Sequence, residues 1–162
     1  MGRFVFLSTF QSVIHQLHFT QFIPAEPAAV WDFFATPDNL NLLIPPELHF
    51  RTLTDPGRMY AGQMIAYRLR ILPGVRIRWL TELTHARAPN YFVDEQRIGP
   101  YKLWHHEHHF TPKDGGVEMT DRVTYTLPFA VLGEVVHRLW VRRTLERVFA
   151  FRREKIAARF SS

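Results

Sequence analysis

The sequence predicts an α+β domain in which a curved antiparallel sheet of about seven strands wraps around one long C-terminal helix. Two observations carry this prediction. Turn-separated segments of alternating polarity fill most of the chain, which favours consecutive antiparallel strands. Residues 131–160 instead repeat apolar side chains at helical spacing. A curved sheet has one concave face to bury, and a single long helix can cover it.

The first strand and two short helices come at the start. Residues 15–23 alternate in polarity and predict a half-buried strand. Pro27 is well placed to begin a short helix over 27–35, because proline is tolerated at the first helical position. Pro37 begins a second short helix, which ends before Pro45.

Six further strands follow the short helices. Pairs and triplets of proline, glycine, aspartate and asparagine separate them, and such short connections favour hairpins between neighbouring strands. The predicted strands cover residues 48–54, 63–72, 75–86, 90–98, 101–112 and 117–127.

The long helix carries two apolar faces that lie about half a turn apart. One surface cannot bury both faces at 3.6 residues per turn. We expect either a bend near Trp140 or a contact of the first turns with something other than the sheet, such as a pocket mouth. The first face holds Leu132, Val135, Val136 and Leu139, and the second holds Val141, Leu145, Val148, Phe149 and Ile156.

The positive charge of the chain is concentrated in the same helix. Between Glu134 and Phe160 there are eight basic and three acidic residues, and this difference of +5 equals the net charge of the whole chain. A basic helix can meet nucleic acid or an anionic membrane surface. We favour a solvated face whose arginine stems cover apolar surface, and we expect no nucleic-acid partner.

The chain of 162 residues suits one domain over residues 15–160, preceded by an N-terminal extension over 1–14. The apolar segment 4–14 follows Arg3, but it is short and no small-residue cleavage site follows, so export is disfavoured. No segment approaches the roughly 18–20 apolar residues that span a bilayer. With no cysteine to form disulfides, we expect a cytoplasmic protein.

Short segments spread from about residue 15 to 160 carry a family resemblance. They are Val30-Trp31-Asp32-Phe33-Phe34, Pro37-Asp38-Asn39-Leu40, Ile44-Pro45-Pro46, Phe92-Val93-Asp94-Glu95-Gln96, Gly99-Pro100-Tyr101, Trp104 to Phe110, Met119-Thr120-Asp121, Val141-Arg142-Arg143 and Phe149 to Arg152. These segments resemble the START/SRPBCC superfamily of polyketide cyclases and pollen-allergen-related proteins, and most closely a bacterial subgroup of uncharacterised ligand-binding SRPBCC proteins. The resemblance implies the helix-grip fold. It does not indicate the ligand, because this fold hosts lipid carriers, cyclases and hydrolases alike.

Alternation along three of the predicted strands gathers large rings and a few polar groups on one face. A mostly apolar face with a few polar groups is typical of a small-molecule pocket. The predicted ligand-binding residues are Phe92, Asp94, Gln96, Trp104, His106, His108, Phe110, Met119, Asp121 and Tyr125.

Four of these residues could also carry chemistry. His106 or His108 beside Asp121 or Asp94 could act as a general base or acid in a cavity of low dielectric. We favour a satisfied internal hydrogen-bond network, which buried polar groups require in any case. The two histidines also share a face at workable metal-ligand spacing. A zinc site needs three or four ligands, however, and nothing in the pattern requires one here, so we expect no metal and no cofactor.

The sequence therefore favours the binding of a small hydrophobic or amphipathic molecule in an internal cavity between the sheet and the C-terminal helix. Two alternatives stay open. One is a cyclase- or hydrolase-like enzyme that uses a His–Asp pair in the same cavity. The other is a peripheral membrane or partner-binding protein that uses the basic C-terminal helix. Neither the identity of the ligand nor the oligomeric state follows from the residues.

Overall fold

The computed structural model describes residues 13–72 and 74–161, and its strands form a seven-stranded sheet in the order β1-β7-β6-β5-β4-β3-β2. Every neighbouring pair of strands is antiparallel. The elements in chain order are β1 (His15–Ile23), α1 (Pro27–Phe34), η1 (Pro37–Leu42), η2 (Pro46–Leu48), β2 (Arg51–Thr52), β3 (Gln63–Leu72), β4 (Val75–Arg87), β5 (Tyr91–Ile98), β6 (Leu103–Lys113), β7 (Gly116–Thr126), α2 (Ala130–Val136), η3 (His137–Val141) and α3 (Arg142–Phe160).

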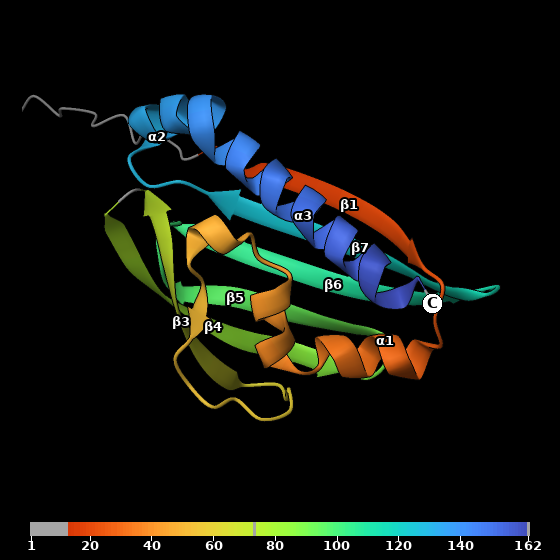
Figure 1. The fold of residues 1–162 in the computed structure, drawn as a ribbon. Helices are drawn as coiled ribbons and strands as arrows, with labels where there is room; N and C mark the ends of the chain where they lie inside the picture. The colour runs from red at the N-terminus through yellow and green to blue at the C-terminus, as the bar shows by residue number, and fades with distance from the viewer. Residues whose placement is uncertain (1–12, 73, 162) are drawn as a thin grey trace, which may run out of the picture.

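The long C-terminal helix crosses one face of the curved sheet, while α1, η1 and η2 cover another part of the same face (Figure 1). In contact terms, α3 packs on β1, α1 packs on β6 and β7, and η2 packs on β3. A curved antiparallel sheet with a long C-terminal helix across one face is the helix-grip architecture. The predicted fold is therefore confirmed.

The region between α1 and β3 differs from the prediction. Instead of a strand over 48–54, only the two-residue β2 forms. The preceding residues Pro46–Leu48 form the 3₁₀ helix η2, and His49 after them adopts a left-handed conformation with φ of 43°. A strand requires negative φ, so it cannot pass through His49. The second short helix is also 3₁₀ rather than α.

The alternation of faces on β6 and β7 is confirmed by the strand register. Trp104 pairs with Tyr125 and Phe110 pairs with Met119, so the even-numbered residues of β6 and the odd-numbered residues of β7 share the inward face. Asp94 of β5 pairs in turn with His106 of β6. The inward face of three neighbouring strands therefore combines large rings with ionisable groups.

A π-helical segment, η3, separates α2 from α3 and contains Trp140. A π-turn inserts one extra residue, which rotates the helix face that follows by about 100°. This rotation accounts for the two apolar faces of the sequence. Val141 at the end of η3 and Leu145, Phe149 and Ile156 of α3 are buried.

The first apolar face does not pack as predicted. Val135 and Leu139 are 50% and 69% exposed, so the expectation that they need burial is wrong. Val136 is 40% exposed and lines the cavity described below. The side chain of Leu132 lies outside the described residues. The extra residue of η3 turns this face away from the sheet, which explains its exposure.

The start of the chain is only partly described. Residues 1–12, which include most of the predicted extension and of the apolar segment 4–14, lie outside the described residues. Residues 13 and 14 precede β1 without regular secondary structure. Among the helices that are described, none combines the length and the apolar character that crossing a membrane requires.

Candidate functional site

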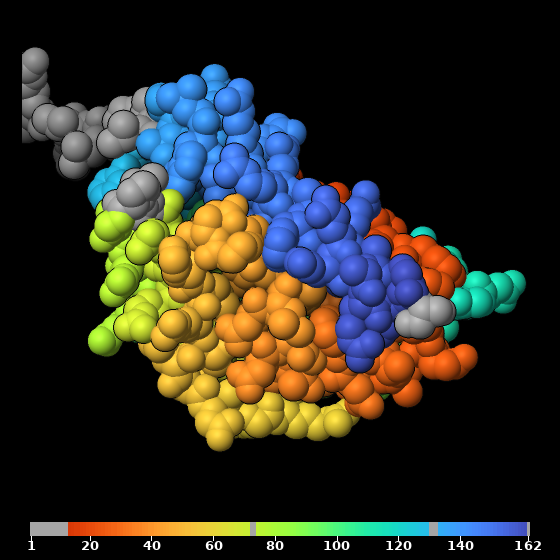
Figure 2. Space-filling view, viewed as in Figure 1, coloured from red at the N-terminus to blue at the C-terminus, as the bar shows by residue number. Residues whose placement is uncertain are grey.

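A cavity of about 420 Å³ lies between the inner face of the sheet and the helices that cover it. Its walls are mostly apolar. The side chains of α3 and of the η1–η2 segment meet over this face of the sheet (Figure 2). Representative lining residues are Tyr67, Leu69 and Trp79 of the sheet, Leu40 of η1, and Leu145 and Val148 of α3.

One end of the cavity is polar, and we call its five residues the inner cluster. Strand β5 supplies Asp94, β6 supplies His106 and His108, β7 supplies Asp121, and α3 supplies Arg152. Alternating positions on β6 bring both histidines to the inner face, and the register places them opposite the two aspartates. Four of the five line the cavity, whereas Asp121, which contacts both imidazoles, does not.

Each imidazole of the inner cluster bridges the two carboxylates. His106 has Nε2 3.0 Å from Asp121 Oδ1 and Nδ1 3.4 Å from Asp94 Oδ2. His108 has Nε2 3.0 Å from Asp94 Oδ2, in a hydrogen bond. Its Nδ1 lies 2.8 Å from Asp121 Oδ1, but the angle is not that of a hydrogen bond. The two rings lie against each other with centroids 3.8 Å apart and planes tilted by 39°.

The protonation states follow from the balance between burial and charge. Burial opposes ionisation of Asp94 and Asp121, but the histidines and Arg152 outweigh it and hold the pKa of both carboxyls below the usual range. Burial and the neighbouring His108 lower the pKa of His106. Burial also acts against the charge of His108, yet Asp121 and Asp94 outweigh it and raise its pKa.

At a pH between the pKa of His106 and that of His108, the inner cluster is therefore electrically balanced. Asp94 and Asp121 carry two negative charges, and the imidazolium of His108 and the guanidinium of Arg152 carry two positive charges, while His106 is neutral. Buried charges are tolerated when they are paired in this way. These contacts join the His–Asp group into one network of hydrogen bonds and ion pairs.

Arg152 belongs to the inner cluster, although the charge pattern of the helix predicts it on a solvated face. Only 8% of Arg152 is exposed, and its guanidinium lies over the ring of Phe149. Its Nη1 is 3.5 Å from Asp121 Oδ1. Both Nε and Nη1 lack a hydrogen-bond partner among the described residues. The signal was present in the spacing, because Phe149, Arg152 and Ile156 fall on one helix face.

The ten predicted ligand-binding residues are divided between the cavity and its surroundings. Phe92, Asp94, Trp104, His106 and His108 line the cavity.

The other five residues lie outside its lining. Gln96 holds a turn, because its side-chain amide donates a hydrogen bond to the carbonyl of Tyr101 and accepts one from the backbone N–H of Tyr101. Phe110 packs in the core under α1, with Met119 in the same core. Asp121 and Met119 line a smaller hollow of about 250 Å³ between β7 and α3. The hydroxyl of Tyr125 forms a hydrogen bond outside the cavity, with a histidine of the C-terminal helix.

Comparison with known proteins identifies the family to which the chain belongs. Residues 15–161 match the model of a family described as polyketide cyclase / dehydrase and lipid transport. Protein Ms6760 from Mycobacterium smegmatis is 19% identical, with a TM-score of 0.63 over 89% of this chain and 92% of that chain. Major latex-like protein 151 from Panax ginseng is 11% identical, with a TM-score of 0.67 over 91% and 97% of the two chains.

A third similar structure is the nucleoside-diphosphate sugar epimerase from Corynebacterium glutamicum, at 26% identity and a TM-score of 0.65. The match covers 86% of this chain but 28% of the epimerase chain. No curated protein matches the chain significantly. Structural likeness at 11% and 19% identity shows the fold alone, whereas the family match runs from β1 to the end of α3. The chain therefore belongs to the polyketide cyclase / dehydrase and lipid transport family, within the START/SRPBCC superfamily.

Proposed function

We propose that the protein binds a small, mainly apolar molecule that carries an oxygen atom at one end. The observation that carries the proposal is the cavity of about 420 Å³ with apolar walls and one polar end. Ligand pockets in proteins have volumes of roughly 300–1,000 Å³ and a few placed polar groups among apolar walls. Membership in a family described in part by lipid transport supports the same reading.

The inner cluster supports a neutral oxygen acceptor as the polar end of the ligand. Arg152 has two buried donors without a partner, and leaving a buried donor unpaired costs about 1–3 kcal/mol. A ligand hydroxyl or carbonyl oxygen would satisfy them. Because the cluster is already balanced in charge, a neutral oxygen also adds no unpaired charge to the low-dielectric interior.

Acid–base catalysis has weaker support from this geometry. In each ring of His106 and His108, both nitrogens face a carboxylate oxygen within 3.4 Å. A general base must present a free nitrogen to its substrate. Neither ring does so in this arrangement, and binding is therefore the function that we propose.

The cavity assignment is tested by filling the cavity. We expect Val148→Trp, which places a large ring at a lining position of α3, to abolish binding of the neutral fluorescent probe N-phenyl-1-naphthylamine. Ala157→Trp is the matched control, because Ala157 is an exposed residue of the same helix outside the cavity lining. Circular dichroism checks that both variants fold. Equal probe binding by the two folded variants would reject the cavity as the binding site.

A second candidate function, contact with an anionic membrane surface, is favoured by one specific observation. Apolar side chains stand exposed beside the cavity, with Phe129 80% and Leu139 69% exposed. Phe129 itself also lines the cavity. The neighbouring Arg138 and Arg142 have side chains exposed by 77% and 62%. Exposed apolar groups flanked by arginines suit a surface of anionic lipid, from which an apolar ligand could be collected.

A further inference from the structure

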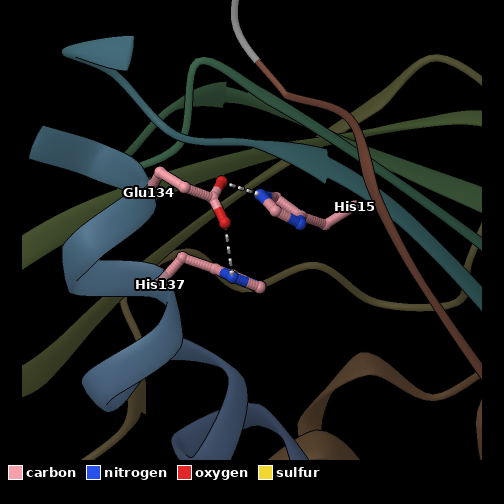
Figure 3. Close-up of side chains that lie close together, drawn as sticks. All are labelled: His15, Glu134 and His137. Carbon is pink, nitrogen blue, oxygen red and sulfur yellow. Dashed lines mark ion pairs between the residues drawn. The ribbon is translucent and has the colours of Figure 1, made fainter. Parts of the chain in front are cut away.

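A second group of ligating side chains lies outside the cavity lining, and we call it the outer triad. It consists of His15 at the start of β1, Glu134 of α2 and His137 of η3. Both imidazoles direct a nitrogen toward the carboxylate of Glu134 (Figure 3). His15 Nε2 is 3.2 Å from Glu134 Oε2, and His137 Nδ1 is 3.8 Å from Glu134 Oε1.

The outer triad leaves polar atoms buried and unused. His137 is 6% exposed, and its Nδ1 has no hydrogen-bond partner among the described residues. The same holds for Glu134 Oε2, whose approach to His15 is not aligned as a hydrogen bond. A buried acceptor without a donor is costly, and a cation bound by these two atoms would remove that cost.

Neighbouring groups hold the ligand atoms in place. The hydroxyl of Tyr125 is 2.8 Å from His137 Nε2, so when Nε2–H donates to Tyr125, the lone pair of the ring is on Nδ1. Arg138 donates from Nε to Glu134 Oε1 at 3.2 Å, which leaves Oε2 facing His15. Second-sphere hydrogen bonds of this type orient histidine and carboxylate ligands at metal sites.

We propose that a divalent ion of the zinc class binds His15 Nε2, Glu134 Oε2 and His137 Nδ1. Two imidazoles and one carboxylate are an established zinc ligand set, with the fourth tetrahedral position open to water. Ligand atoms at zinc bond lengths lie about 3.3 Å from one another. Those of the triad all lie within 4.8 Å of one another. The two imidazoles are stacked with centroids 3.6 Å apart and planes 16° apart, so they must rotate out of the stack to direct both nitrogens at one ion.

The inner cluster offers a competing group, Asp94, His106 and His108, whose ligand atoms are equally close together. There, however, each ring nitrogen already faces a carboxylate oxygen, and Arg152 adds a buried positive charge 3.5 Å from Asp121. In that cluster, the side chains of His108 and Arg152 already occupy the positions beside the carboxylates that a metal ion would take. Within the described part of the chain, the outer triad has the exposed Arg138 at its edge but no buried arginine or lysine beside it, so it is the better site for an added ion.

Zinc binding to the untagged, full-length chain tests the proposal, after removal of metal with a chelator and then of the chelator. Isothermal titration with ZnCl₂ is expected to show saturable binding of one ion per chain. We expect His15→Gln and Glu134→Gln each to weaken binding at least about 100-fold, because each removes one of three ligands. His18→Gln, an exposed histidine of the same strand, is the control and should bind as the wild type does.

Two further variants separate ligation from folding and from the inner cluster. Tyr125→Phe removes only the hydroxyl that orients His137, and we expect it to weaken zinc binding about 10-fold while circular dichroism stays unchanged. His108→Gln should leave zinc binding intact. No saturable binding, or binding that survives His15→Gln but is lost in His108→Gln, would overturn the proposal. Probe binding to the metal-free protein tests the cavity separately, so either proposal can fail without the other.

Discussion

Two histidines of the same strand, His106 and His108, have opposite pKa shifts although they contact the same two carboxylates. For His106, burial and the neighbouring imidazole of His108 lower the pKa by more than the two aspartates raise it. For His108 the contacts with Asp121 and Asp94 outweigh burial. One protonated and one neutral imidazole is therefore the arrangement that leaves no net charge in the buried cluster.

This difference predicts a specific pH dependence. The pKa of His108 is raised above 6.5, so His108 contributes stability that is fully present below pH 6.5 and is lost as the pH rises through its folded-state pKa. Urea unfolding at a pH below 6.5 and at one above that folded-state pKa measures the loss. In His108→Gln this component should be missing. The order of titration is checked by NMR of the ring protons, and a pKa of His106 above that of His108 would contradict it.

The buried Arg152 allows charge to be separated from hydrogen-bond geometry. Arg152→Met leaves the carboxylates of the inner cluster with one cation fewer, and we expect a loss of about 3–5 kcal/mol in the free energy of unfolding. Arg152→Lys keeps the charge but loses the planar donor fork. We expect it to unfold nearly as the wild type does, yet to retain less co-purified ligand in native mass spectrometry. Equal retention by Arg152→Lys and the wild type would show that the fork does not hold the ligand.

At the scale of elements, the π-turn η3 decides what the C-terminal helix covers. Downstream of it, α3 buries its apolar face on the sheet, and Arg153 ties the helix to β1 through a hydrogen bond to Thr20 O of 2.6 Å. Upstream, α2 faces the cavity through Gly133 and leaves Val135 exposed, and η3 itself leaves Leu139 exposed. One helix thus contributes to the core at one end and to an apolar surface at the other.

That exposed surface carries a prediction for membrane contact. We expect the wild type to sediment with vesicles that contain anionic lipid, and Leu139→Glu to reduce this binding, because it puts a negative charge among the exposed apolar groups. Ala158→Glu, an exposed position at the far end of α3, is the charge-matched control and should have a smaller effect. High salt should weaken the binding. Equal sedimentation of the two variants would argue against a membrane role for α2 and η3.

At the scale of the whole molecule, the sheet and the helices enclose one space with two chemical environments. Apolar side chains from β3, β4, η1 and α3 form most of the wall. Ionisable groups gather where β5, β6 and β7 meet α3. A ligand in this space would be oriented by the polar end and held mainly by the apolar walls.

The order of elements and the facing of β6 and β7 could be predicted because both depend on local signals. Alternation places Trp104 and His106 on the same face of a strand regardless of how the neighbouring strands pack, and proline and glycine mark the turns. The prediction of a strand over 48–54 was wrong for a local reason too, because η2 and the left-handed conformation of His49 interrupt it. These features are determined by the amino-acid sequence alone.

The sites themselves depend on contacts between distant segments. Arg152 joins Asp121 across the helix–sheet interface, and His15 meets His137 although the whole sheet separates them in the chain. Alternation predicts which face of the sheet a residue occupies, but it does not predict how far the cavity extends along a curved sheet. For this reason Gln96 and Tyr125 lie outside the cavity lining. The sequence by itself determined the helix-grip fold and its inward faces. Only the packing of α2, η3 and α3 on the sheet decided which of those residues meet, because that packing brings together groups that no local pattern relates.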